Sequence, residues 1–247
     1  MNNYEKFLQL HHQEKPLIIA NAWNVKSAQL IEAQGYAAIA TSSGAIADSL
    51  GYPDGEKIPF DELLYVIKRM AASTSIPLSV DLERGYTDNL DQLNSHIQQL
   101  IDLGVVGINL EDAQGEDIYL KKLTSVKSYV TKNKLQLFIN ARTDVFLQKL
   151  ESPLETTLKR AKLYTEAGAD SLFVTGISDL ELVQQITSSV KLPVNVVAVP
   201  KLGSIQALAA SGVKRISMAV LLYKATYGNL EKLAKAIETE QSFAPLY

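Results

Sequence analysis

The most constraining feature of this 247-residue sequence is a pattern of helix, glycine and strand that recurs along the chain. An amphipathic segment ends and an apolar run begins at Gly35, Gly104, Gly168 and Gly212. Glycine is common just after a helix because it readily adopts the left-handed backbone that closes the last turn. Each of these glycines therefore predicts the end of a helix and the approach of a strand.

The remaining apolar runs mostly begin at prolines. Such runs follow Pro16, Pro77 and Pro193, and an eighth occupies residues 135–142. Strands are thus predicted near residues 17, 36, 78, 106, 136, 170, 194 and 214, with helical patterns between them. Eight apolar strands that alternate with helices predict a TIM-type (β/α)8 barrel, which fits a single domain over residues 1–247. A doubly wound open sheet is the alternative, but residues 21–24 lack its glycine-rich phosphate turn.

Three segments lie outside the strand pattern. Residues 3–13 predict a short lead-in helix, and residues 220–239 predict an amphipathic C-terminal helix suited to contacts between subunits. Residues 42–60 form the longest predicted irregular segment. Loops of that length in a compact domain are usually functional or mobile.

Composition narrows the classes of function. The chain has no cysteine, which excludes disulfides, zinc–thiolate sites and cysteine nucleophiles. Its net charge of −3 provides no basic surface for nucleic acid or membrane. The N-terminus lacks the apolar core of a signal peptide, and no apolar run approaches the ~18 residues of a membrane span. We therefore expect a cytoplasmic protein that binds neither nucleic acid nor membrane.

Acidic side chains follow two neighbouring predicted strands. Asp81 and Glu83 are two residues apart after the third strand, and Asn109 and Glu111 repeat this spacing on the fourth. Alternate residues of a strand share a face, so three carboxylates and an amide are expected to converge at the C-terminal end of the barrel. Oxygen ligands of this kind suit Mg²⁺ or Mn²⁺ rather than zinc.

Two further groups are suited to anions. Arg142, on the fifth strand, carries a guanidinium fork that matches a carboxylate or a phosphate. Pairing of Arg142 with Glu111 or Asp112 is the structural alternative. The hydroxyl and N–H groups of the Ser-Ser-Gly turn at 42–44 are suited to a second anionic group.

The three histidines are not expected to take part in catalysis. His11 and His12 fall in the predicted lead-in helix, and His96 falls in the helical stretch 89–103. All three lie away from the predicted strand ends, where a barrel concentrates its chemistry. We therefore expect them on the solvated surface.

Six segments of the chain resemble the isocitrate lyase and phosphoenolpyruvate mutase superfamily. In chain order they are Asn21–Trp23, Ala40–Gly44, Ser49–Gly55, Asp81–Tyr86, Gly107–Asp112 and Ile139–Asp144. The resemblance covers nearly the whole barrel. It is closest to the short, phosphonomutase-type branch, whose substrates are unassigned.

The resemblance implies a magnesium site, with manganese as an alternative metal. The metal ligands that it implies, partly through water, are Asp81, Glu83 and Glu111. Glu83 stands where the mutases usually have an aspartate. The aspartate that lies near the metal on a mobile loop corresponds to Asp54.

The resemblance also implies where a substrate binds. The serine-glycine turn of the family holds the substrate carboxylate, and the arginine after the fifth strand, here Arg142, contacts the substrate. The residues that we expect to bind substrate are Ser42, Ser43, Gly44, Trp23 and Asn195.

The chain departs from the family after Glu111. Lyases of the family carry a Lys-x-Cys-Gly-His type segment on a gating loop, whose cysteine protonates the departing enolate. Mutases and phosphonate hydrolases have a longer gating loop with an asparagine or threonine and a lysine. Both are absent here, so Tyr86 or a metal-bound water is nominated as the proton donor.

These observations together predict a magnesium-dependent carbon–carbon lyase. Its substrate is expected to be a small 2-oxo or 2-hydroxy carboxylate, cleaved or decarboxylated through a metal-stabilised enolate. A phosphonopyruvate hydrolase or mutase is the second hypothesis, and a non-catalytic carboxylate-binding relic of the family is the third. The resemblance further implies a homodimer or homotetramer.

Overall fold

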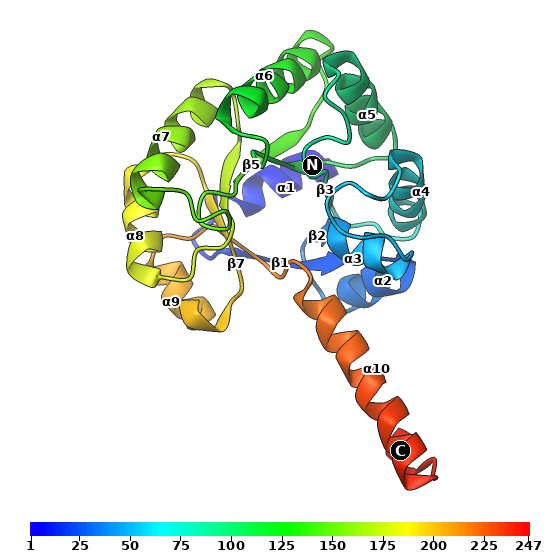
Figure 1. The fold of residues 1–247 in the computed structure, drawn as a ribbon. Helices are drawn as coiled ribbons and strands as arrows, with labels where there is room; N and C mark the ends of the chain where they lie inside the picture. The colour runs from blue at the N-terminus through cyan, green and yellow to red at the C-terminus, as the bar shows by residue number, and fades with distance from the viewer.

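The computed structural model describes all 247 residues and contains a closed barrel of eight parallel strands in chain order (Figure 1). This confirms the prediction of a TIM-type barrel. The strands are β1 (Leu17–Ala22), β2 (Ile39–Thr41), β3 (Leu78–Asp81), β4 (Gly107–Glu111), β5 (Phe138–Thr143), β6 (Ser171–Val174), β7 (Val194–Val197) and β8 (Arg215–Ser217).

Helices surround the barrel on its outer face (Figure 1). The α-helices are α1 (Asn3–Leu10), α2 (Val25–Ala33), α3 (Ser43–Ser49), α4 (Phe60–Ala71), α5 (Leu90–Asp102), α6 (Glu116–Lys132), α7 (Pro153–Glu166), α8 (Leu180–Ser189), α9 (Ile205–Ala210) and α10 (Leu221–Glu240). Two short 3₁₀ turns are η1 (Pro200–Leu202) and η2 (Ala244–Leu246). None of the helices combines the length and apolar character that a membrane-spanning segment requires.

Two sequence boundaries differ from the prediction near β2. The strand was expected from Tyr36 but begins at Ile39. The segment 42–60 was expected to be irregular, yet it contains helix α3. The Ser42 side chain caps this helix by accepting a hydrogen bond from the backbone N–H of Ala45. Burial of the apolar residues that follow, including Ile46, then stabilises a helix of only seven residues.

The prediction that the histidines are exposed is wrong for two of the three. His11 is fully buried, and its ring stacks on Phe138 at a centroid distance of 4.2 Å. His96 is also buried and stacks on Phe60 at 3.6 Å. Burial lowers the pKa of His11 to about 3, so its ring is neutral. Both rings act as flat apolar surfaces that fill space under the helices.

Helix α1 closes the N-terminal end of the barrel. Phe7 on this helix is fully buried and meets Phe138 edge-to-face, with ring centroids 5.3 Å apart. Gly107 faces the Phe7 ring, and a Cβ at position 107 would lie 2.9 Å from the Phe7 Cε1. The bottom of the barrel is therefore closed by an apolar cluster of Phe7, Leu17, Ile19, Ala38, Ala40, Val106 and Phe138.

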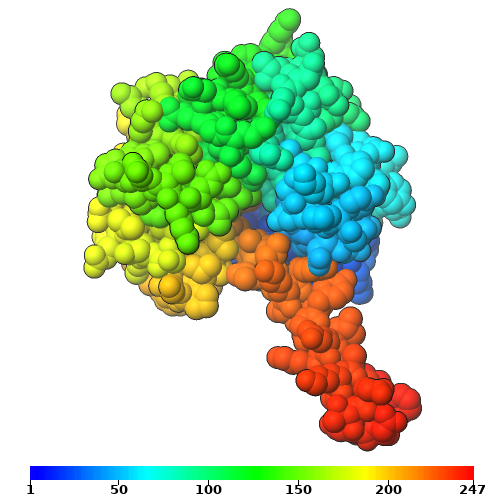
Figure 2. Space-filling view, viewed as in Figure 1, coloured from blue at the N-terminus to red at the C-terminus, as the bar shows by residue number.

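Helix α10 extends away from the barrel (Figures 1 and 2). None of its residues is buried, although Trp23 and Tyr223 meet edge-to-face where the helix leaves the barrel, with centroids 5.3 Å apart. Large apolar side chains on α10 and the turn after it are exposed, among them Leu230 and Phe243.

Truncation of Phe7 tests the role of α1 as a plug. Phe7→Ala should lower the melting temperature by about 10 °C, because loss of a fully buried phenylalanine costs about 3–5 kcal/mol. Tyr65→Ala removes an aromatic ring that is 64% exposed and should leave the melting temperature nearly unchanged. Equal stability of the two variants in calorimetry would contradict this role.

Candidate active site

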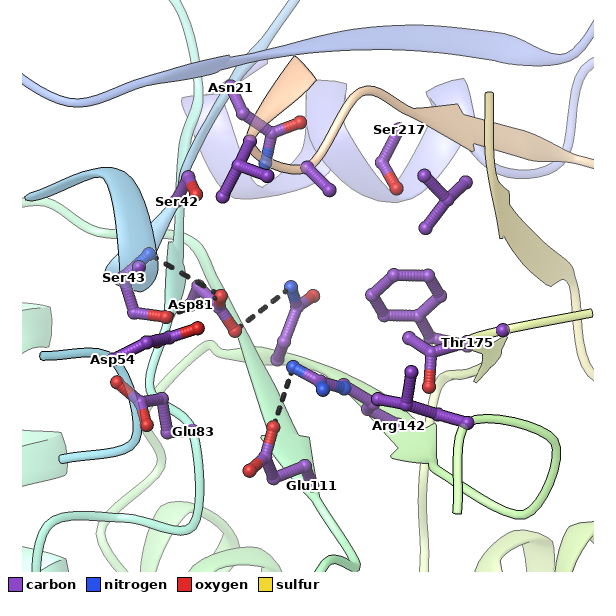
Figure 3. A pocket seen from close by; sticks show the side chains of 18 of the residues that line it. Asn21, Ser42, Ser43, Asp54, Asp81, Glu83, Glu111, Arg142, Thr175 and Ser217 are labelled. Atoms are coloured by element: carbon purple, nitrogen blue, oxygen red, sulfur yellow. Dashed lines mark hydrogen bonds and ion pairs between the residues drawn. The ribbon is translucent and has the colours of Figure 1, made fainter. Parts of the chain in front are cut away.

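A cavity of about 350 Å³ opens at the C-terminal ends of the strands (Figure 3). Its polar lining comes from strand ends and the loops that follow them, as the barrel fold predicts. The polar and glycine residues that line it are Asn21, Ser42, Ser43, Gly44, Asp54, Gly55, Asp81, Glu83, Asn109, Glu111, Arg142, Thr175, Gly176 and Ser217. The apolar ones are Leu147, Phe173, Val197, Ala219 and Val220.

Asp81 occupies the end of β3 and is held from three sides. The Ser43 hydroxyl donates a hydrogen bond of 2.9 Å to its Oδ2, and the Asn109 amide donates one of 3.5 Å to its Oδ1. The backbone N–H of Asp81 donates to the Thr41 hydroxyl at 2.9 Å. The two side-chain contacts fix the orientation of the carboxylate in the cavity, and the backbone contact fixes the end of β3.

Glu83 enters the same cavity from a tight turn rather than from the strand. β3 ends at Asp81, and Glu83 has a left-handed backbone with φ of 48°. The side chain of Glu56 holds this turn by accepting hydrogen bonds from the backbone N–H groups of Arg84 and Tyr86 at 2.9 and 2.7 Å. Glu83 thus lines the cavity with Asp81, but this turn brings it there and not the strand alternation on which the prediction rested.

Asp54 reaches the cavity from the loop between α3 and α4. Its carboxylate lies over Gly44, where a Cβ would come within 2.9 Å of the Asp54 Cγ. Only glycine at position 44 leaves room for this approach. Asp54, Asp81 and Glu83 consequently face one another on one side of the cavity (Figure 3).

Arg142 and Glu111 form an ion pair at the other side of the cavity (Figure 3). The Arg142 Nη1 lies 2.6 Å from the Glu111 Oε2. Nε and Nη2 of Arg142 donate to the two carboxylate oxygens of Asp144 at 2.7 and 3.0 Å. Of the two structural partners considered for Arg142, the structure shows the pairing with Glu111. Asp112 instead accepts hydrogen bonds from Thr143 and from side chains of α7.

Burial, with repulsion from neighbouring carboxylates, makes Glu83 and Glu111 weaker acids. Burial, followed by the charge of Asp81, raises the pKa of Glu83 to about 7, although a hydrogen bond of 3.0 Å from the Tyr86 hydroxyl opposes the shift. Burial raises the pKa of Glu111 to about 8 despite the opposing effect of Arg142. Both carboxylates would be more readily ionised beside a cation.

The predicted metal ligands line one cavity but do not form a closed coordination sphere. No three acidic or histidine side chains lie close enough together to hold one ion directly. Mg²⁺ commonly keeps several waters and binds through only one or two carboxylates. The oxygen donors of Asp81, Glu83 and Asp54 fit that mode of binding, with Glu111 engaged by Arg142.

The structure brings together most, but not all, of the predicted site. Ser42, Ser43 and Gly44 line the cavity, whereas Trp23, Tyr86 and Asn195 do not. Trp23 packs against α10, the Tyr86 hydroxyl donates to Glu83 from behind it, and Asn195 is fully buried inside the barrel. Tyr86 is therefore poorly placed to donate a proton to a bound substrate.

Two residues that organise the site were not predicted to do so. Glu56 holds the turn that carries Glu83, and Asp144 holds the fork of Arg142. Asp144 follows the fifth strand and so carried a weak positional signal. Glu56 lies in a loop with no pattern, and its partners are brought to it only by folding.

Comparison with known proteins shows the family to which the chain belongs. Residues 7–238 match the family model described as phosphoenolpyruvate phosphomutase. The chain belongs to the isocitrate lyase and phosphoenolpyruvate mutase superfamily. Its relatives include lyases and mutases, and it is an enzyme of this group.

Three relatives illustrate its place in the superfamily. The structure of a candidate phosphonomutase from Burkholderia cenocepacia J2315 is 34% identical, with a TM-score of 0.90 over 94% of this chain and 99% of that one. An uncharacterised protein of Mycobacterium tuberculosis is 33% identical over 94% of this chain and 88% of its own length. The 2-methylisocitrate lyase of Escherichia coli is 29% identical over 74% of this chain and 65% of that enzyme.

The raised pKa values predict a pH dependence of stability in metal-free protein. An acid with a higher pKa in the folded than in the unfolded state favours folding at low pH, and this advantage is lost as the pH rises to the folded value. Glu83 should lose its contribution to stability between pH 4.5 and about pH 7. Glu111 should lose its contribution between pH 4.5 and about pH 8. The melting temperature should fall by about 10 °C between pH 5.5 and 9.

Glu83→Gln should flatten this decline, because the amide does not ionise. The exposed change Glu14→Gln serves as its control and should keep the wild-type profile. A Glu83→Gln profile that parallels wild type from pH 5.5 to 9 would contradict the assignment.

Proposed function

We propose that this enzyme is a magnesium-dependent carbon–carbon lyase that acts on a small 2-oxo or 2-hydroxy carboxylate. The observation that carries this proposal is that one cavity gathers three carboxylates on one side and presents Arg142, paired with Glu111, on the other side. Asp54, Asp81 and Glu83 lie on the first, and Arg142 lies on the second (Figure 3). Such a cavity suits a divalent cation and a carboxylate bound side by side.

The residues around Arg142 have defined tasks in this proposal. Asp144 takes up Nε and Nη2, so the guanidinium is held in a fixed plane. A substrate carboxylate would replace Glu111 at Nη1, and the released Glu111 would turn its charge toward the cation. The hydroxyls of Ser42 and Ser43 line the opposite wall, where a second carboxylate would bind.

The bond cleavage requires a site for negative charge. When the bond between the third and fourth carbons of a 2-oxo acid breaks, its electron pair stays on the third carbon and is delocalised onto the oxo oxygen as an enolate. A bound Mg²⁺ would supply the Lewis acid that stabilises this charge. Tyr86 does not line the cavity, and its hydroxyl donates to Glu83. The proton that completes the product would therefore come from a lining carboxylic acid or from water.

The loop after β4 favours a lyase over phosphorus–carbon chemistry. β4 ends at Glu111 and α6 begins at Glu116, so only four residues, 112–115, connect them. This connection has no room for the longer gating loop implied for the phosphonate enzymes. The resemblance to the 2-methylisocitrate lyase supports the same choice, although its gating segment is also absent here.

A substrate screen tests the proposal directly. Small 2-oxo and 2-hydroxy carboxylates would be incubated with enzyme and Mg²⁺, while pyruvate and other 2-oxo products are followed by a coupled assay. Formation of such a product supports the lyase. Phosphate release from phosphonopyruvate would favour the second hypothesis, and tight 2-oxo acid binding with no product would favour the non-catalytic relic.

Removal of the Asp81 carboxylate should impair both Mg²⁺ binding and lyase activity. In Asp81→Ala, Mg²⁺ affinity should fall at least about a hundredfold, and lyase activity should be lost with it, because even outer-shell partners of a metal contribute 10–100-fold. The control Asp102→Ala removes an exposed carboxylate at the end of α5 and should bind Mg²⁺ as wild type does. Unchanged Mg²⁺ affinity and activity in Asp81→Ala would refute the proposed role.

We also propose that the chain is one domain whose last helix packs against another subunit in a homodimer or homotetramer. Helix α10 lies apart from the barrel and has no buried residue (Figure 2). Its exposed apolar side chains include Tyr227 and Leu230, and Phe243 follows it. A helix with such a surface is stabilised when a partner covers it.

Sedimentation velocity tests the assembly. The wild-type protein should sediment as a dimer or tetramer, and the double variant Leu230→Glu/Phe243→Glu should shift toward the monomer because it buries charge at the contact. Lys232→Glu adds a negative charge at an exposed polar position of α10 and should shift it less. A monomeric wild-type protein at all concentrations would rule out this assembly.

A further inference from the structure

A buried arginine below the cavity has no ionic partner. Arg215, the first residue of β8, is 1% exposed, and no carboxylate lies within 4.0 Å of its guanidinium. None of its three side-chain nitrogens makes a hydrogen bond. The Phe7 ring, 5.9 Å from its Cζ, borders it on the side of α1. A buried cation in this state is costly to folding, so its presence calls for an explanation.

Arg215 lies directly below the floor of the cavity. Ser217, two residues further along β8, lines the cavity, which puts Arg215 one side-chain layer, about 7 Å, lower. On β7, Asn195 pairs in register with Arg215, and on β6 Phe173, which lines the cavity, pairs with Asn195. Both polar atoms of the Asn195 side chain also lack hydrogen bonds.

The charge of Arg215 lies below an acidic cavity and is felt by Asp81. Of the charged side chains that line the cavity, four are carboxylates and Arg142 alone is cationic. Burial lowers the pKa of Arg215 to about 10, and the charge of Asp81 opposes this shift. The guanidinium therefore stays charged at neutral pH, and no ion pair of its own cancels its field.

We propose that Arg215 is a positioning residue that acts on the cavity through its fixed positive charge. It repels a divalent cation and attracts an anionic carboxylate, so that the cavity binds the cation well only together with its anionic ligand. This inference rests on the proposed function for the identity of the two ligands. A role in packing alone predicts no such difference between a cation and an anion.

The two ligands should respond to Arg215→Met in opposite directions. Methionine fills a similar volume without charge, and neutral replacement of a buried charge is often tolerated. In calorimetric titrations, Mn²⁺ or Mg²⁺ alone should bind about fivefold tighter than to wild type. Oxalate, a small dicarboxylate, should bind about fivefold more weakly at saturating metal. Weakening of both ligands, or no change in either, would overturn the proposal.

Two further variants separate charge from structure. Asn195→Asp puts a carboxylate beside the intact guanidinium and should reproduce both shifts by cancelling its field. Arg215→Lys keeps the charge and should behave as wild type. If Asn195→Asp leaves both affinities unchanged, or Arg215→Lys behaves like Arg215→Met, the charge of Arg215 is not responsible and the proposal fails.

The wild-type titrations distinguish this inference from the proposed function. If wild type binds neither metal nor oxalate, both the proposed function and the inference fall. If wild type binds both ligands and the charge variants do not shift them in opposite directions, the proposed function stands and only the role of Arg215 is refuted.

Discussion

Repulsion between carboxylates in one buried cavity is the constraint on which the rest of this site depends. Asp54, Asp81, Glu83 and Glu111 all line the same space at the mouth of the barrel. Burial disfavours ionisation, and like charges at short range add to the effect, as the raised pKa values of Glu83 and Glu111 show. The barrel supports this arrangement because β3 and β4 fix Asp81 and Glu111 at their ends, while a turn and a loop bring Glu83 and Asp54 to the same space.

The structure limits this repulsion by local partners. Arg142 neutralises Glu111, Tyr86 donates to Glu83, and Ser43 donates to Asp81. A bound cation could take over the role of the donors to Glu83 and Asp81. A bound carboxylate could replace Glu111 at Arg142. The free enzyme therefore holds its acids in arrangements that ligands can exchange, which is the physical basis of the proposed function.

Much of the fold could be predicted because it depends on local signals. Glycines after helices and prolines before apolar runs marked seven of the eight strands, and strand-end acids marked the mouth of the barrel. His11 and His96 were misplaced because their burial depends on rings from distant segments. The contacts of Glu56 and the isolation of Arg215 likewise arise only when separate loops and strands meet, so no spacing in the sequence reveals them.

A crystal structure of the enzyme grown with Mn²⁺ and oxalate tests the central claim most directly. We predict one strong anomalous peak in the cavity beside Asp81 and Glu83, partly surrounded by water. We also predict that oxalate lies between the ion and Arg142, with Glu111 released from the guanidinium. An anomalous peak outside this cavity, or an empty cavity at saturating concentrations of both ligands, would contradict the central claim.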